Sequence, residues 1–133
     1  MSGLHITDIE AAINHWRRHC PSPDGVRLSP ELQALAPVYA RMIHAGLQEI
    51  SPAQLSDAAM QAWLAWYETQ PDTPCIAICS TSQGDAQCKG CGRSFGEVQR
   101  WLEFTPMQKR AVWRRIVDEG TALRFTRYAE RAQ

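Results

Sequence analysis

The chain has 133 residues, of which 44% are hydrophobic and 21% charged, and its formal net charge is zero. This composition is that of a globular protein with one domain or two very small ones, and it excludes an intrinsically disordered chain. A neutral chain gives no global reason to expect binding to nucleic acid or to acidic lipid, and no stretch is long enough to span a bilayer.

The first predicted element is a helix that opens at Thr7. Thr7 and Glu10 form the pattern of a capping box, with Thr7 as the cap and Glu10 reaching back. Apolar residues then recur at the helical spacing i, i+3, i+4, i+7, at Ile9, Ala12, Ile13 and Trp16. Pro21 and the residues that follow it end this helix.

A second helix is predicted from Ser29, with Pro30 at its first position and Gly46 as its end. Pro37 lies inside the apolar pattern of this helix. It is expected to kink the helix or to split it near Ala36, because proline cannot donate a backbone hydrogen bond.

A third helix is predicted from about Ser56 to Thr69, with an apolar face made by Met60, Trp63, Leu64 and Tyr67. Trp66 lies about 100° off the centre of this face, so it is expected either to be exposed or to pack on a second module. Proline-rich residues 70–74 then mark a boundary between modules.

Two more helices follow in the second half. Ser94 and Glu97 form a capping box before a helix that carries Val98, Trp101 and Leu102. Thr105 and Gln108 form another before a helix whose apolar face is Val112, Trp113, Ile116 and Val117 and which ends at Gly120. No strand of useful length is predicted.

The expected fold is therefore mainly α, with two modules. A three-helix module occupies residues 1–72, and a small four-cysteine, metal-stapled loop followed by two helices occupies residues 73–133. The two halves differ in charge. Residues 1–74 contain four arginines and eight acidic residues, a net charge of −4, and residues 75–133 contain ten basic and six acidic residues, a net charge of +4.

The second half contains four cysteines in two close pairs, Cys75-x3-Cys79 and Cys88-x2-Cys91, separated by eight residues. Four thiolates in this arrangement suit a tetrahedral ion or a small iron–sulfur cluster. On a strand the first pair would lie roughly 13 Å apart, too far for one ion. On a helical turn the rise is only about 6 Å, so residues 75–79 are expected to form a turn or a short helix.

The second pair has the form of a metal knuckle. Gly90 and Gly92 allow left-handed backbone, so that amide groups can turn toward the sulfurs. Lys89 and Arg93 are expected to offset the negative charge of the thiolates. We predict a zinc ion, with an iron–sulfur cluster as the alternative.

The N-terminus has no secretory signal, so we expect a cytoplasmic protein in which clustered cysteines bind metal rather than form disulfides.

The cysteine segment resembles a known family. From about Thr73 to Val117 the sequence reads T-P-C-I-A-I-C, then C-K-G-C-G-R-S-F-G-E-V-Q-R-W, then T-P-M-Q-K-R-A-V-W-R-R-I. It is similar to the short bacterial proteins of the domain of unknown function 1289 family, commonly described as predicted iron–sulfur or metal proteins. The resemblance implies that Cys75, Cys79, Cys88 and Cys91 are the family's ligands.

The first half resembles a second family. The sequence I-T-D-I-E-A-A-I-N from Ile6 to Asn14, Trp16, and the segment from Leu32 to Ile43 are similar to domain of unknown function 3717. This resemblance covers roughly residues 5–66 and implies a small helical module without an assigned function.

The functional hypothesis is a structural four-cysteine zinc site that supports an interaction module, with an unknown protein as the possible partner. An iron–sulfur protein in electron transfer or sensing is the alternative. A nucleic-acid-binding accessory protein is third, because the C-terminal part is rich in Lys and Arg. We favour a solvated helix over a nucleic-acid surface, since Lys109, Arg110 and Arg115 point in different directions around their helix. No catalytic constellation is recognised, so an enzyme is not expected, nor is a membrane partner.

Overall fold

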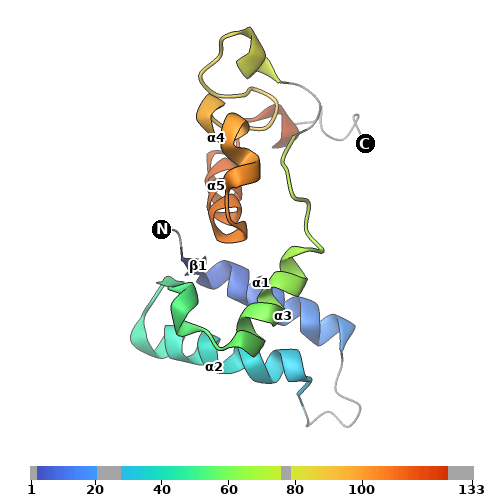
Figure 1. The fold of residues 1–133 in the computed structure, drawn as a ribbon, viewed down its shortest axis with the longest axis vertical. Coiled ribbons are helices and arrows are strands. Elements are labelled where there is room, and N and C mark those ends of the chain that lie inside the picture. The colour runs from blue at the N-terminus through green and yellow to red at the C-terminus, as the bar shows by residue number, and fades with distance from the viewer. Residues whose placement is uncertain (1–2, 21–27, 76–78, 126–133) are drawn as a thin grey trace. The chain divides into compact units, whose positions relative to one another are not determined.

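The computed structural model describes residues 3–20, 28–75 and 79–125, and the chain divides into two compact units, residues 1–70 and 71–133 (Figure 1). The structure is mainly α, as the sequence predicts. No helix in the described part of the chain combines the length and the apolar character needed to cross a membrane.

The described residues of the first unit, 3–20 and 28–70, form three α-helices and a minimal sheet. Their elements are β1 (Leu4–His5), α1 (Ile6–His19), α2 (Pro30–Ala45), β2 (Glu49–Ile50), the 3-10 helix η1 (Pro52–Gln54) and α3 (Asp57–Tyr67). The two strands are antiparallel, with Leu4 opposite Ile50. Each strand has only two residues, so the pair ties the start of α1 to the segment after α2 without forming a layer of its own.

The predicted start of α1 is wrong by two residues. The helix begins at Ile6, its N-cap is His5, and the His5 ring accepts a hydrogen bond from the Thr7 N–H at 3.2 Å. Because β1 leads directly into the helix, Thr7 already lies inside it and cannot act as the cap. Glu10 accepts instead from the hydroxyl of Tyr39 at 3.0 Å, which joins α1 to α2.

Helix α2 begins and ends where the sequence predicts, with Ser29 as N-cap and Gly46 as a left-handed C-cap at φ 68°. The predicted split near Pro37 does not occur, since the helix runs unbroken through it. Pro37 is exposed, whereas Leu35 and Val38 on either side are buried. Burial of this apolar face therefore favours a continuous helix despite the lost hydrogen bond.

The core of the first unit consists mainly of buried apolar side chains. Seven side chains in it have no exposed surface: Leu4, Ile9, Ala12, Leu35, Met42, Ala59 and Trp63. Trp63 stacks on Tyr67 with ring centroids 5.8 Å apart. Trp66 is buried too, with its ring 5.7 Å from that of Trp63, so the exposed alternative predicted for Trp66 is wrong.

Among its described residues, the second unit contains η2 (Ser80–Gln83), α4 (Phe95–Arg100), η3 (Trp101–Glu103), α5 (Pro106–Glu119) and η4 (Leu123–Phe125), where η marks a 3-10 turn. Both predicted capping boxes are present, at Ser94 and at Thr105, and α5 ends at a left-handed Gly120 as predicted. Correct local signals therefore fix both ends of α5 and the start of α4.

A small apolar cluster joins η3 and α5 and consists of Trp101, Val112, Trp113 and Ile116, with Phe104 packed against it. Leu102 and Val117, which the helical pattern placed with these residues, are exposed. For Leu102 the reason is that α4 ends at Arg100 and a tighter 3-10 turn follows. This turn shifts the phase, so that Trp101 faces inward and Leu102 outward.

Candidate metal centre

The second cysteine pair lies on a tight, buried turn. The N–H of Cys88 donates to the carbonyl of Arg93 at 2.7 Å, and the N–H of Gly92 donates to the carbonyl of Cys88 at 2.8 Å. Cys88 and Cys91 are almost completely buried. Of the two glycines, Gly92 adopts the left-handed conformation at φ 90°, but Gly90 does not.

Gly92 is also required by space. A Cβ on this residue would lie only 3.1 Å from the side chain of Ile116. The knuckle therefore sits directly against α5, and both the backbone conformation and the close approach demand glycine at this position.

The sulfur of Cys88 is surrounded by donors. Burial, the largest influence, raises the pKa of this thiol, but the N–H groups of Cys91, Ser80 and Gly90 point at the sulfur and lower the pKa to about 7. Backbone donors aimed at a sulfur favour its thiolate form, which is the form that binds a metal. Backbone amides thus turn toward the Cys88 sulfur, as expected from the sequence, with Gly92 in the left-handed conformation.

The sulfur of Cys91 has a buried cation beside it. The Nε of Arg93 lies 3.3 Å from this sulfur, and the guanidinium stacks on the ring of Trp101 with its carbon 4.8 Å from the ring centroid. Burial, the largest influence, raises the pKa of the Cys91 thiol above its ordinary value, and Arg93 offsets part of this rise. Arg93 thus has the place expected for a charge that offsets thiolates. Lys89 is exposed, and its Nζ lies 3.7 Å from a carboxylate oxygen of Asp85.

The chain around Cys79 is tied to the knuckle. Cys79 is exposed, and its sulfur lies 3.1 Å from the hydroxyl of Thr81. The next residue, Ser80, contacts the knuckle twice, because its N–H points at the sulfur of Cys88 and its hydroxyl accepts from the Lys89 N–H at 2.8 Å. Cys79 is therefore one residue away from a direct contact with the buried pair.

The chain before Cys75 is tied to the knuckle through Arg124. This guanidinium donates to the carbonyl of Pro74 at 2.9 Å, and the Arg124 N–H donates to the carbonyl of Gly90 at the same distance. Cys75 itself is exposed, and its N–H donates to the hydroxyl of Thr73. The turn predicted between the first two cysteines falls on residues 76–78, which lie outside the described residues.

The structure thus brings Cys88 and Cys91 together and ties the neighbours of Cys75 and Cys79 to the same turn. Within residues 3–20, 28–75 and 79–125, no group of three or more His, Cys, Asp or Glu side chains is placed so as to hold a metal ion. The assignment of all four cysteines as ligands of one centre therefore remains a prediction.

The comparisons with known proteins give two family matches. Residues 2–68, half of the chain, match the model described as protein of unknown function (DUF3717). The chain belongs to the DUF3717 family. Residues 73–119 match a second model, protein of unknown function (DUF1289), so both resemblances and their order along the chain are confirmed. No curated protein and no solved structure matches the chain.

In this DUF3717 protein the DUF1289 segment contains a polar network behind the knuckle that the sequence did not reveal. The carbonyl of Gly92 accepts from Arg115 at 2.9 Å and from the side-chain amide of Gln87 at 2.7 Å. Arg115 also binds both carboxylate oxygens of Glu97, at 2.6 and 2.8 Å, and Gln87 donates to Glu119. The network clamps the turn between α4 and α5.

The charges of this clamp reinforce each other. Burial raises the pKa of Glu97, but its bonds with Arg115 and with the Ser94 N–H outweigh burial and hold that pKa below the ordinary value. The bond to Glu97 raises the pKa of Arg115. Only the capping role of Glu97 was visible in the sequence, because its partner lies 18 residues away.

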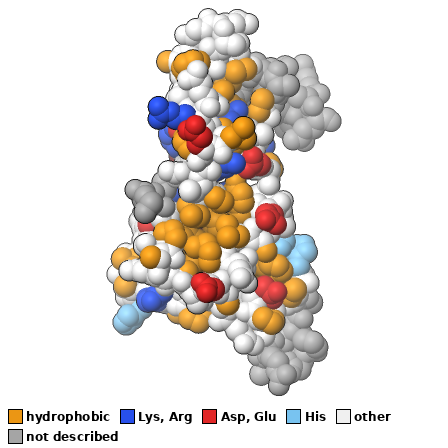
Figure 2. Space-filling model, viewed as in Figure 1, with side chains coloured by type: hydrophobic (Ala, Val, Ile, Leu, Met, Phe, Trp, Pro, Cys, Tyr) orange, Lys and Arg blue, Asp and Glu red, His pale blue; other side chains and the backbone are white. Residues whose placement is uncertain are grey.

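Several basic residues of the second unit are engaged within the unit. Lys109 pairs with Asp72 at 2.8 Å, and the guanidinium of Arg124 lies over the ring of Trp113. Figure 2 shows that Lys and Arg side chains of this unit are interspersed with Asp and Glu on the face in view. Lys109 and Arg124 thus make their contacts with residues of the same unit.

Proposed function

We propose that the protein binds one zinc ion through Cys75, Cys79, Cys88 and Cys91, and that this ion holds the second unit in the shape that a protein partner recognises. The observation that carries the proposal is the buried Cys88–Cys91 turn, with backbone N–H groups on one sulfur and the Arg93 guanidinium against the other.

The residues fit a thiolate-bound ion. Four thiolates around a divalent ion leave an excess negative charge, and a buried cation beside one sulfur offsets part of it. A buried guanidinium is costly without a negative partner, so the position of Arg93 favours an ionised Cys91. Bound zinc would supply a fixed tetrahedral cross-link, and a four-thiolate site is closed to substrate.

The cross-link would act on a segment that cannot fold by apolar burial alone. Residues 80–87 contain no large apolar side chain. Ordering such a loop costs about 1–2 kcal/mol per residue in backbone entropy, and a structural metal can offset that cost because its binding free energy is folding free energy.

We also propose that the protein is cytoplasmic, because thiols stay reduced in the cytoplasm. The first experiment is elemental analysis of protein purified without oxygen. It should show about one zinc per chain, and Cys75→Ser and Cys91→Ser should each lose most of it. Cys20→Ser is the matched control, because Cys20 belongs to the first unit, and it should keep the metal.

Two results would count against parts of the proposal. Full zinc retention in either ligand variant would show that the four cysteines do not act together. Iron with acid-labile sulfide in a coloured preparation would replace zinc with the iron–sulfur alternative while keeping the ligands.

A further inference from the structure

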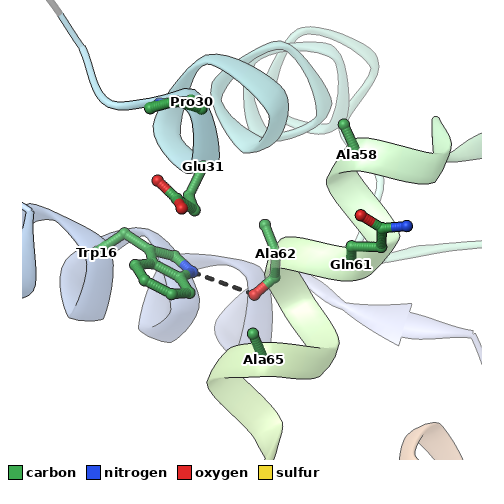
Figure 3. A pocket seen from close by; sticks show the side chains of 7 residues that line it. All are labelled: Trp16, Pro30, Glu31, Ala58, Gln61, Ala62 and Ala65. Atoms are coloured by element: carbon green, nitrogen blue, oxygen red, sulfur yellow. Dashed lines mark hydrogen bonds between the residues drawn. The ribbon is translucent and has the colours of Figure 1, made fainter.

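A pocket of about 230 Å³ opens among the three helices of the first unit (Figure 3). Helix α1 contributes Trp16, the start of α2 contributes Pro30 and Glu31, and α3 contributes Ala58, Gln61, Ala62 and Ala65. Figure 3 shows the Glu31 carboxylate and the Trp16 indole on one side of this space and the alanines of α3 on the other.

The aromatic wall of the pocket is held in place. The indole N–H of Trp16 donates to the carbonyl of Ala62 at 3.1 Å, and the ring of His15 contacts the indole edge-on with centroids 4.9 Å apart. The alanines on α3 are too small to fill the space beside this ring. A fixed indole next to an open, apolar volume is a surface on which a cation can lie.

The carboxylate of Glu31 supplies the charge. Glu31 is half-buried, and it has no hydrogen-bond or ion-pair partner among residues 3–20, 28–75 and 79–125. It lies in the first turn of α2. An unpaired carboxylate beside an indole face selects for a positive charge attached to an apolar stem.

We propose that this pocket binds the side chain of a lysine or arginine from a basic segment of a partner protein. The alkyl stem would lie against Pro30 and the alanines of α3, and the charged group would lie between the Trp16 ring and the Glu31 carboxylate. Residues 1–70, the first unit, contain four arginines and seven acidic residues, a net charge of −3, which attracts a basic rather than an acidic segment. The inference does not depend on the metal centre.

The test is an NMR titration of the full-length protein with a short acetylated and amidated peptide of alternating arginine and glycine. The indole N–H resonance of Trp16 and the amide of Glu31 should shift and saturate, and added salt should weaken the effect. A peptide of alternating glutamate and glycine should leave both resonances unchanged. Equal shifts with both peptides, or no saturable shift, would overturn the proposal.

Variants locate the binding within the pocket. Glu31→Gln should weaken arginine-peptide binding by about threefold to fivefold, the usual range for a partly exposed charge pair. Glu68→Gln, the same charge change at an exposed residue at the end of α3, should not alter it. Ala65→Leu keeps a good helix former on an exposed position and should fill the pocket and block binding. Equal effects of Glu31→Gln and Glu68→Gln, or unchanged binding in Ala65→Leu, would show that the attraction is not specific to the pocket.

Discussion

The two units of this chain are stabilised in different ways. The first has three helices around fully buried apolar side chains, with Trp63 and Met42 among them. In the described part of the second unit the apolar cluster consists of Trp101, Val112, Trp113 and Ile116, and the loop is held by hydrogen bonds to Cys88, Gly92 and neighbouring backbone. Apolar burial is the dominant stabilising term in folding. We therefore expect burial to stabilise the first unit by itself, and the second unit to need an additional source of folding free energy.

Tryptophan has a different role in each of the two units. In the first unit a tryptophan fills the core, whereas in the second Trp101 lies under the Arg93 guanidinium beside a cysteine sulfur. A buried charge next to a sulfur weakens a purely apolar core but suits a metal–thiolate centre. Arg93 therefore links the apolar cluster, through Trp101, to the sulfur of Cys91.

The largest expected effect is that of metal removal. Chelation of the purified protein should cost residues 79–104 their hydrogen-exchange protection, because the proposed ion supplies much of the folding free energy of that segment. Helices α1 and α3 should stay protected, since their contacts involve no ligand. Equal loss of protection in both units would show a single cooperative unit and remove the contrast between them.

The reverse experiment perturbs the apolar unit. Trp63→Ala should destabilise the first unit by about 3–5 kcal/mol, because Trp63 has no exposed surface and its loss leaves a cavity. The loss of stability is measured by denaturant titration, with hydrogen exchange of the α1 amides as the readout. The zinc content should stay the same. A variant that also loses its metal would tie the centre to the core of the first unit.

Arg93→Met tests the buried cation. The substitution keeps an apolar stem over Trp101 but removes the charge beside Cys91, so metal affinity should fall about 10–100-fold, as for other groups that support metal ligands. Competition with a chelator of known affinity measures the change. Arg100→Met, on an exposed arginine of α4, is the control and should bind normally. Equal affinity in the two variants would mean that Arg93 does not act on the centre.

Glu97→Gln should have the smallest effect, about 1 kcal/mol at neutral pH, because glutamine can still cap α4 but cannot pair with Arg115. The folded-state pKa of Glu97 is lowered, so its contribution is present above the ordinary carboxyl pKa and is lost as the pH falls through the lowered one. The stability difference between the two proteins, measured by urea unfolding at each pH, should therefore shrink toward acid. A difference independent of pH would exclude the charge as its cause.

Local signals in the sequence predicted most of the helical structure. Ser94 and Thr105 form the capping boxes expected of them, and the helices predicted to start at Ser29 and at about Ser56 begin there, because a cap depends on residues within one turn. The start of α1 was missed since a long-range strand pair, which no local pattern shows, places His5 at the cap.

The candidate site was only half visible in the sequence. The knuckle follows from the spacing of Cys88 and Cys91, and Arg93 from its place next to the pair. The clamp made by Gln87 and Arg115 could not be predicted, because these residues meet Gly92 only when α5 packs behind the turn. From the sequence, Arg115 is a basic residue on a helix surface, and its pairing with Glu97 is known only from the structure.

X-ray absorption at the metal edge of the purified, reduced protein tests the four-cysteine claim most directly, because it counts the sulfur ligands. We predict four sulfurs at about 2.3 Å from a single zinc ion. Two sulfurs with nitrogen or oxygen ligands would show that Cys88 and Cys91 bind without Cys75 and Cys79, and would contradict the four-cysteine centre.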